Sequence, residues 1–365
     1  MGFVKERIGK LSTAALLLLM SVFLVAAIIS GVSIGTYHIE IDKVWNIFYH
    51  NVIKSITFDQ VILDDPNQWG KGTNYDIVWN TRAPRVLMAC IIGMSLALAG
   101  VVMQATVQNP LADPYILGMS SGASLGATAA IAMGLTGLFG TSFGNYAIAI
   151  FAFMGSFICA LAVLTLSSAG GRTTSVKLVL SGTIIASLFG AVSNLIVVLY
   201  ADKDEMQEIT FWLLGSFGGA NWDKLIIPLL ALIVGIVYFT TQIRNLNTML
   251  MGDDVATTLG IDLSRKRKAY VIITALLTAT AVCFCGIIGF VGLMIPHIVR
   301  GITGNNHWKL IPISILLGAT FMVLADIMAR KILPGSELPI GIITAFCGAP
   351  VFAYIMIKKS YSFSN

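Results

Sequence analysis

The sequence predicts an all-α, polytopic membrane protein, and two features of its composition predict it. Of the 365 residues, 56% are hydrophobic and 11% are charged, whereas about a quarter of the residues in soluble domains are charged. Apolar runs of about 20 residues, the length that crosses a bilayer, recur along the chain. A soluble protein has no use for so many such runs, so we expect a single transmembrane domain over residues 1–365.

Ten apolar runs are candidates for membrane spans. The first follows a basic segment and begins at Leu11, but it is longer than the apolar core of a secretory signal, about 7–15 residues. We therefore expect a retained first helix. The expected spans are residues 11–34, 84–106, 114–134, 146–168, 176–200, 224–242, 269–286, 288–302, 310–332 and 339–357.

Charge predicts how these spans are oriented. The basic cluster Arg265–Lys268 and most other Lys and Arg residues fall on the side that also holds both termini. Because Lys and Arg gather on cytoplasmic loops, we expect both termini in the cytoplasm and the protein in the plasma or inner membrane. Residues 35–83 then form an external loop, and residues 244–268 form a cytoplasmic segment.

The connection between the second and third spans contains two prolines. Asn109-Pro-Leu-Ala-Asp-Pro114 must interrupt the helices, because proline lacks a backbone donor. Asp113 is placed to cap a helix that begins at Pro114. Glycines follow at positions 118, 122 and 126, and such a stripe of small residues typically allows two membrane helices to approach closely.

Charged residues also occur at and within the spans. Arg82 and Arg85 lie at the outer end of a span, against the orientation bias. Two interpretations stay open: the side chains snorkel to the interface, or they are displayed for an acidic partner. Asp326 lies inside a span with Arg330 one turn later, and both a structural ion pair and a proton or ion site fit this pattern.

The segment between the sixth and seventh spans predicts two short helices that are hinged at Gly252. Asp253 is placed to cap the second helix, and Gly260 is placed to end it. Its polar face is nearly neutral, whereas a helix on a membrane surface is usually basic. The segment therefore suits docking into a groove on another protein.

Motifs of catalysis are missing from the sequence. It contains no phosphate-binding loop, zinc-protease motif or nucleophile elbow. The five cysteines lie in apolar runs without zinc-ligand spacing, and we expect His297 to be structural. We therefore expect a non-enzymatic chain with no catalytic residue, metal site, bound cofactor or nucleic-acid partner, which cannot hydrolyse ATP alone.

Together these stretches resemble the FecCD-type permeases, the family of the vitamin B12, haem and ferric-siderophore importers. The similarity covers about residues 80–358. The pieces that carry it are Arg82-x-Pro-Arg85, Asn109-Pro-Leu-Ala-Asp-Pro114, Gly118-x-Ser-Ser-Gly-Ala, Phe211-Trp-Leu-Leu-Gly-Ser216, Gly289-Phe-Val-Gly-Leu with Pro296-His297, and Glu337-Leu-Pro-x-Gly341 with Gly348-Ala-Pro350.

The resemblance implies a type II ABC importer permease that pairs as a homodimer around the transport path; a heterodimer with a second permease stays open. It implies membrane lipid around the dimer, two cytoplasmic ATPase subunits that carry ATP and magnesium, and an extracytoplasmic substrate-binding protein. The implied substrate is a metal chelate, with iron(III)-siderophore first because it is the commonest, and cobalamin or haem as alternatives.

The resemblance also implies roles for particular residues. It places docking of the binding protein on Arg82, Arg85 and Arg330. It places the cytoplasmic gate at Asn109, Leu111, Thr173 and Thr174. It places coupling to the ATPase at Met251, Gly252, Asp253, Asp254, Leu259 and Gly260. It places the external gate at Phe211, Trp212 and Gly215.

Two rival functions stay open from the sequence. An ion-coupled secondary transporter needs charged residues near the middle of the bilayer at broken helices, and only Asp326 meets this requirement. A structural membrane component without transport is the second rival. Uptake that survives collapse of the ion gradient, but not loss of an ATPase partner, would exclude the first.

Overall fold

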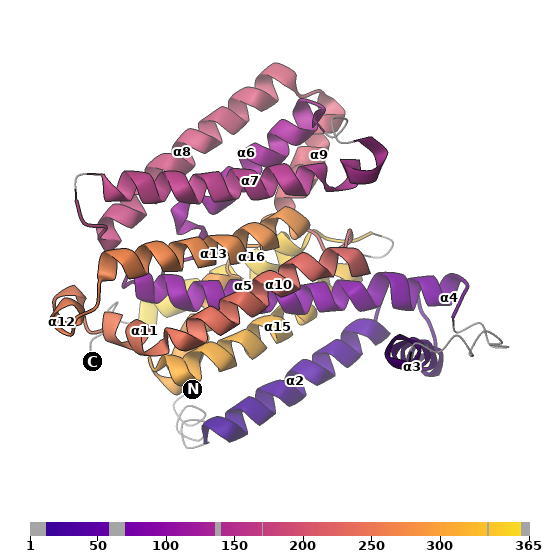
Figure 1. Ribbon diagram of the computed structural model, residues 1–365. Helices are drawn as coiled ribbons and strands as arrows, with labels where there is room; N and C mark the ends of the chain where they lie inside the picture. The colour runs from indigo at the N-terminus through magenta and orange to yellow at the C-terminus, as the bar shows by residue number, and fades with distance from the viewer. Residues whose placement is uncertain (1–11, 58–69, 136–139, 170, 334–335, 359–365) are drawn as a thin grey trace.

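The computed structural model describes residues 12–57, 70–135, 140–169, 171–333 and 336–358, and this part of the chain is built from helices (Figure 1). In chain order the helices are α2 (Thr13–Ser33), α3 (Ile41–Thr57), α4 (Thr73–Tyr75), η2 (Asp76–Arg82), α5 (Ala83–Thr106), η3 (Pro114–Leu117), α6 (Met119–Ala132), α7 (Gly140–Ser168), α8 (Ser175–Tyr200), α9 (Lys203–Leu214), α10 (Trp222–Thr241), α11 (Ile243–Met249), α12 (Asp253–Thr258), α13 (Leu263–Cys285), α14 (Val291–Thr303), α15 (His307–Lys331) and α16 (Ile340–Lys358).

Seven helices in the described part of the chain are long and apolar enough to cross a membrane. They are α2, the continuous helix Thr73–Thr106, residues Tyr146–Ser168 of α7, α8, α10, α13 and α15. Two shorter apolar helices, α14 and α16, and the 14-residue helix α6 occupy the remaining expected spans. The described helices therefore match all ten predicted spans, and the prediction of an all-helical polytopic membrane protein is confirmed.

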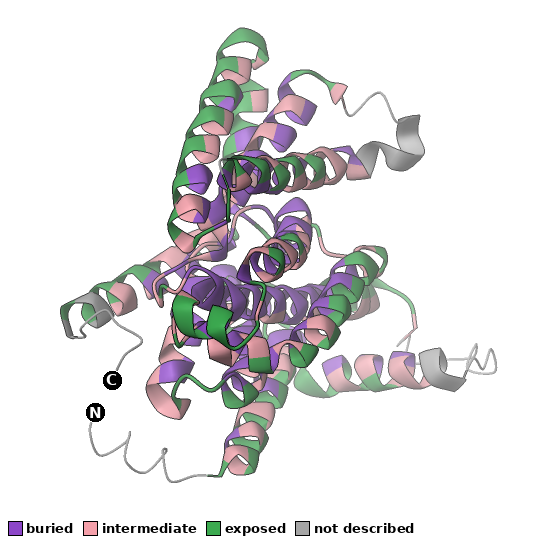
Figure 2. Cartoon of the chain, turned by 60° about the vertical axis from the view of Figure 1, so that its left-hand side comes forward, coloured by how far each residue is buried: buried purple, intermediate pink, exposed green. Residues whose placement is uncertain are grey.

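Helix α5 lies at the centre of the bundle. It packs against α10, α13, α14 and α15, and 89% of its most apolar stretch is buried. Helices α6, α7 and α8 form a layer beside α13, and α2 packs against α15 on the opposite side (Figure 1). Helix α8 is the least covered span, with 11% of its apolar stretch buried, and Figure 2 shows the exposed residues along the helix at the top of the molecule.

Glycine allows α6 to lie directly against α7. A Cβ atom on Gly126 would lie 2.0 Å from the carbonyl oxygen of Phe151 on α7, so any larger residue would separate the helices. Gly118 is different, because it precedes α6 with a φ of +74° and ends η3. Gly118 therefore makes a left-handed turn at the start of α6, and it is also closely packed, because a Cβ atom there would lie 3.1 Å from Ala186 Cβ and 3.2 Å from Cys159 Sγ.

Helix ends confirm one of the sequence-based expectations and correct another. The Asp113 carboxylate accepts a hydrogen bond from the backbone N–H of Tyr115 at 2.8 Å, and Pro114 begins η3 as predicted. Asp253 does not cap α12, whose N-cap is Gly252 and has no side-chain hydrogen bond.

The described part of segment 35–83 is packed rather than loose. Helix α3 is amphipathic and buries Val44 and Ile47 against the bundle. The rings of Trp79 and Trp222 lie 4.8 Å apart, and Trp222 donates an indole hydrogen bond to the Trp79 carbonyl at 2.9 Å. These contacts attach the segment before α5 to the start of α10.

Candidate functional site

The fold gathers the predicted site residues at two opposite ends of the bundle. Helices α11 and α12 lie at one end, and α4 and α9 lie at the other (Figure 1). The α12 end contains the residues expected for the cytoplasmic gate and for coupling to the ATPase. The α9 end contains those expected for the external gate and for docking of the binding protein.

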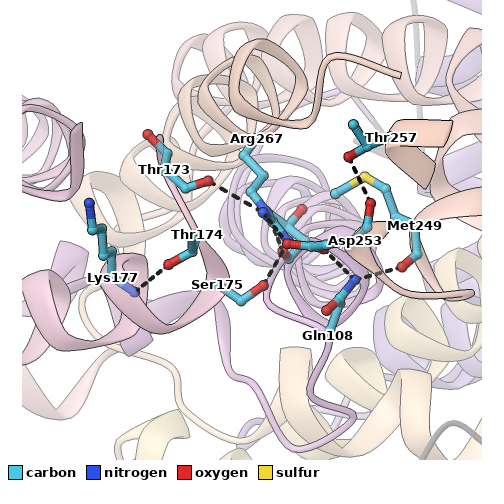
Figure 3. A network of polar contacts seen from close by, with 10 residues as sticks. Gln108, Thr173, Thr174, Ser175, Lys177, Met249, Asp253, Thr257 and Arg267 are labelled. Atoms are coloured by element: carbon cyan, nitrogen blue, oxygen red, sulfur yellow. Dashed lines mark hydrogen bonds and ion pairs between the residues drawn. The ribbon is translucent and has the colours of Figure 1, made fainter. Parts of the chain in front are cut away.

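An ion pair between a buried arginine and a partly exposed aspartate organises the α12 end (Figure 3). Arg267, on α13, donates to both carboxylate oxygens of Asp253 at 2.9 and 2.7 Å. The Arg267 side chain is 1% exposed, and that of Asp253 is 38% exposed. Such a bidentate pair fixes orientation as well as distance, so the first residue of α12 is held in one geometry against α13.

Gln108 joins the same carboxylate from the loop after α5. Its amide nitrogen donates to Asp253 Oδ1 and to the carbonyl of Met249, both at 2.8 Å. Gln108 has a φ of +53°, a region that non-glycine residues seldom occupy. The strained turn therefore directs this side chain toward the hinge between α11 and α12.

The residues expected for the cytoplasmic gate lie in the two loops around this ion pair. Asn109 is exposed, and its side-chain oxygen accepts from the backbone N–H of the half-buried Leu111 at 2.9 Å. Thr173 is buried, and its hydroxyl lies 3.2 Å from that of Ser168. Thr174 caps α8 by accepting from the N–H of Lys177 at 3.3 Å. The fold thus brings both loops to the α12 end, where they are linked through Arg267.

Helix α12 and the residues at its two ends present an apolar surface. Met251, Val255 and Leu259 are exposed, whereas Ala256 between them is buried. Gly252 and Gly260 have φ values of +102° and +84° and turn the chain before and after α12, which confirms the predicted hinge and stop. The remaining expected coupling residue, Asp254, is exposed.

The arginines expected for docking meet at the α9 end, but they are buried. Arg85 binds Asp326 at 2.8 Å and Glu337 at 2.7 Å, and Arg330 binds Asp326 at 3.0 Å. Asp326 is fully buried. The ion-pair interpretation of Asp326 and Arg330 is therefore correct, and Arg85 belongs to the same cluster.

Arg82 is buried as well and is bound to backbone carbonyls. It donates to those of Val32, Ser33 and Tyr37 after α2. The interpretation that Arg82 and Arg85 are displayed at the surface is wrong in this structure, because Arg82, Arg85 and Arg330 are residues of only 3–5% exposure. Their donors serve groups within the chain, which the sequence pattern could not indicate.

The expected external gate residues end α9 in a tight junction. The carbonyl of Gly215 accepts from the N–H of Ile340, and the N–H of Ser216 donates to the carbonyl of Cys285. A Cβ atom on Gly286 would lie 2.2 Å from the carbonyl oxygen of Trp212. The end of α9 is thus fixed to both α13 and α16, while Phe211 remains exposed.

Sequence reasoning missed three residues of these clusters: Arg267, Gln108 and Glu337. For Arg267, the sequence does contain a pattern that indicates a buried position. Leu263, Tyr270 and Thr274 form the buried face of α13, and helical periodicity places Arg267 on that same face. A charge on a buried face indicates a specific partner, whereas the basic cluster had been interpreted only as an orientation signal.

This geometry can be compared with that of known proteins. The sequence matches the FecCD transport family over residues 22–358. The chain belongs to the FecCD transport family. A solved structure, described as an inward-facing conformation of a metal-chelate type ABC transporter, is similar with a TM-score of 0.77 and 30% identity, covering 94% of this chain and 99% of that one.

Curated relatives of this FecCD chain include named permeases. It is 40% identical to the uncharacterised ABC transporter permease YvrB of Bacillus subtilis, covering 92% of both chains. It is 37% identical to the cobalamin import permease BtuC of Halobacterium salinarum, covering 80% of this chain and 76% of the relative. It is 35% identical to the vitamin B12 import permease BtuC of Salmonella paratyphi A, covering 81% and 88%.

Membership of the FecCD family decides the class of function. The chain is a multi-pass, non-catalytic permease subunit of an ABC importer. This class of importer implies an ATPase and a binding protein as partners. The finding favours an ABC importer over both an ion-coupled secondary transporter and a structural component without transport.

Proposed function

We propose that this FecCD permease imports a metal chelate as a homodimer, with two ATPase subunits bound at the α12 end and a binding protein at the α9 end. The observation that carries the proposal is the surface of α12. Met251 and Leu259 are 65% and 63% exposed and, with Val255, recur every four residues. Exposed apolar residues outside the spans mark a protein interaction site.

The residues next to α12 also support an orientation of the chain in the membrane. The basic cluster Arg265–Lys268 lies in the first turns of α13, next to α12, and such clusters favour the cytoplasm. ATPase subunits act in the cytoplasm, so the α12 end faces it. Ten spans return the chain to its starting side, so in the proposed orientation both termini lie in the cytoplasm.

The two ends then act as the two gates of the transport path between the protomers. Asn109, Leu111, Thr173 and Thr174 form the cytoplasmic gate beside α12. Phe211, Trp212 and Gly215 form the external gate at the end of α9. The buried cluster of Arg82, Arg85 and Arg330 holds the outer ends of α2, α5 and α15 together beneath the surface to which the binding protein docks.

The proposed substrate is cobalamin. Two relatives of 35–37% identity are named for its import, and the similar solved structure is described as of metal-chelate type. The iron(III)-siderophore expected from the sequence, and haem, are the alternatives that the same assay tests.

The test is uptake by cells from which this gene has been deleted. The cells are supplied in turn with cobalt-labelled cobalamin, an iron-labelled siderophore and iron-labelled haem, with and without a plasmid that carries the gene. We expect the plasmid to restore uptake of one chelate, and that uptake should persist when an uncoupler collapses the ion gradient but cellular ATP is maintained. Uptake that requires the gradient instead would overturn the proposal.

A further inference from the structure

Arg267 joins three parts of the α12 end that are distant in sequence. Besides the two bonds to Asp253, its Nε donates to the carbonyl of Thr106 at 3.2 Å. Its Nη1 donates to the carbonyl of Thr173 at 3.3 Å, and its Nη2 donates to the hydroxyl of Ser175 at 2.8 Å. A guanidinium has five N–H donors, and these five contacts use all of them.

Each acceptor belongs to a segment that the proposed function assigns to the gate or to coupling. Thr106 ends α5 and is followed by the loop that contains Asn109 and Leu111. Thr173 and Ser175 flank the N-cap of α8, and Asp253 begins α12. One side chain on α13 therefore contacts both gate loops and the coupling helix.

These contacts are strong because the guanidinium that makes them is buried and charged. Arg267 is 1% exposed, and a charged hydrogen bond in a low-dielectric interior is stronger than one in water. Separating the segments would leave a buried guanidinium without its counter-ion, which is strongly unfavourable. The direct link from Gln108 to Asp253 and Met249 adds a second connection between the α5 loop and the hinge.

We propose that Arg267 is the positioning residue that makes both gate loops move together with α12. The proposal rests on the proposed function, in which α12 receives the motion of the ATPase. When α12 shifts, Asp253 pulls the guanidinium, and the guanidinium carries Thr106 and the Thr173–Ser175 turn with it. Both loops of the cytoplasmic gate thereby move when α12 is displaced.

Arg267→Lys is the most informative variant. An ammonium keeps the charge, but it has three donors on one atom and cannot span the acceptors of all three segments. Arg265→Lys is the matched control, because it makes the same chemical change two residues earlier at an exposed position. Ser175→Ala is a milder second variant that removes one acceptor without leaving a buried charge unpaired.

The first measurement is the amount of cobalt-labelled cobalamin taken up per ATP hydrolysed by the reconstituted complex of permease, ATPase and binding protein. We expect Arg267→Lys to lower this ratio about tenfold, Ser175→Ala to lower it two- to threefold, and Arg265→Lys to leave it unchanged. A residue with only a structural role would lower the yield of folded complex and leave the ratio of the surviving complex unaltered, which would overturn the proposal.

The second measurement reports the motion directly and needs no substrate. Spin labels are placed at the exposed positions Arg172→Cys and Thr258→Cys in a Cys347→Ser background, and the distance between them is measured with and without ATP. Because the proposed homodimer carries two labels in each protomer, several distances are measured. We expect the distance within one protomer to have a narrow distribution in both states and a broadened one when Arg267→Lys is added. A distance that changes with ATP in the otherwise unchanged chain would show that the loops do not follow α12.

These outcomes separate failure of the inference from failure of the proposed function. If the wild-type complex transports no chelate and does not bind the ATPase at α12, the proposed function fails. If the wild-type complex transports a chelate but the ratio and the label distance are the same with Lys at position 267, only the role of Arg267 fails.

Discussion

Gly122 and Gly155 face each other across the contact between α6 and α7. A Cβ atom on Gly122 would lie 2.4 Å from the carbonyl oxygen of Gly155, and one on Gly155 would lie 2.2 Å from that of Gly122. Gly122→Leu must therefore push the two backbones apart, at a cost of at least about 1–3 kcal/mol. We expect a lower midpoint of thermal unfolding in detergent, measured by the loss of monodisperse protein on heating.

The control for this prediction is Gly190→Ala on α8. A Cβ atom at Gly190 would meet nothing within 4 Å, and alanine is the better helix former. The midpoint of this variant should equal or exceed that of the wild type. Equal midpoints for Gly122→Leu and the wild type would contradict the close contact.

Gly252→Val should uncouple ATP hydrolysis from transport while the protein still inserts into the membrane. Gly252 has φ +102° and ψ 158°, a region that is essentially restricted to glycine and costs other residues about 1–3 kcal/mol. A Cβ atom there would meet nothing within 4 Å, so the effect is on the backbone of the hinge alone. The measurement is binding-protein-stimulated ATP hydrolysis and uptake in proteoliposomes; normal values for both would contradict the prediction.

Asp326→Asn should destabilise the protein far more than Glu337→Gln. Asp326 is fully buried between Arg85 and Arg330, whereas the Glu337 side chain is 40% exposed. Removing the buried partner leaves uncompensated charges and costs about 3–5 kcal/mol, while a partly exposed pair contributes about 0–1 kcal/mol. Thermal unfolding of the two variants in the same detergent tests this, and equal shifts of the midpoint would refute it.

The Asp113 carboxyl should make the free energy of unfolding depend on pH, and Asp113→Asn should remove this dependence. Asp113 lies between α5 and η3, outside the spans, and burial raises its pKa to about 6. Because the folded-state pKa is raised, the stabilising contribution of this carboxyl is complete below its unfolded pKa of about 4 and is lost as the pH rises through 6. The unfolding free energy of the wild type minus that of Asp113→Asn should thus fall by roughly 1–3 kcal/mol between pH 4 and pH 7. Denaturant titrations in detergent at several pH values measure this difference, and no change with pH would contradict it.

Much of the fold is predictable from the sequence, because membrane spans are local. Each apolar run, read alone, predicts a helix, even for the short α14 and α16, although α7 and α13 each begin six residues before the predicted limit. The hinge at Gly252 was also predictable, because a positive φ requires a particular residue type at one position. Neither inference needs knowledge of distant contacts.

The clusters of charge were not predictable in the same way. Arg85 lies at the outer end of its helix, and its partners Asp326 and Glu337 are 241 and 252 residues away in the chain. From the sequence the arginine was therefore interpreted as exposed. Arg267 was interpreted only as part of a basic cluster, although helical periodicity places it, unlike Arg265, on the buried face of α13.

The separation between Arg85 and Asp326 has a consequence for biosynthesis. A chain that grows at about 5–20 residues per second delivers Asp326 roughly 10–50 s after Arg85. Over that interval α2 and α5 already exist, while the carboxylate that will neutralise Arg85 has not yet been made. The new arginine must wait at the aqueous interface, where a long basic side chain can keep its charge in water. Arrival of α15 then closes the outer cluster, so the last part of the bundle completes helices that entered the membrane among the first.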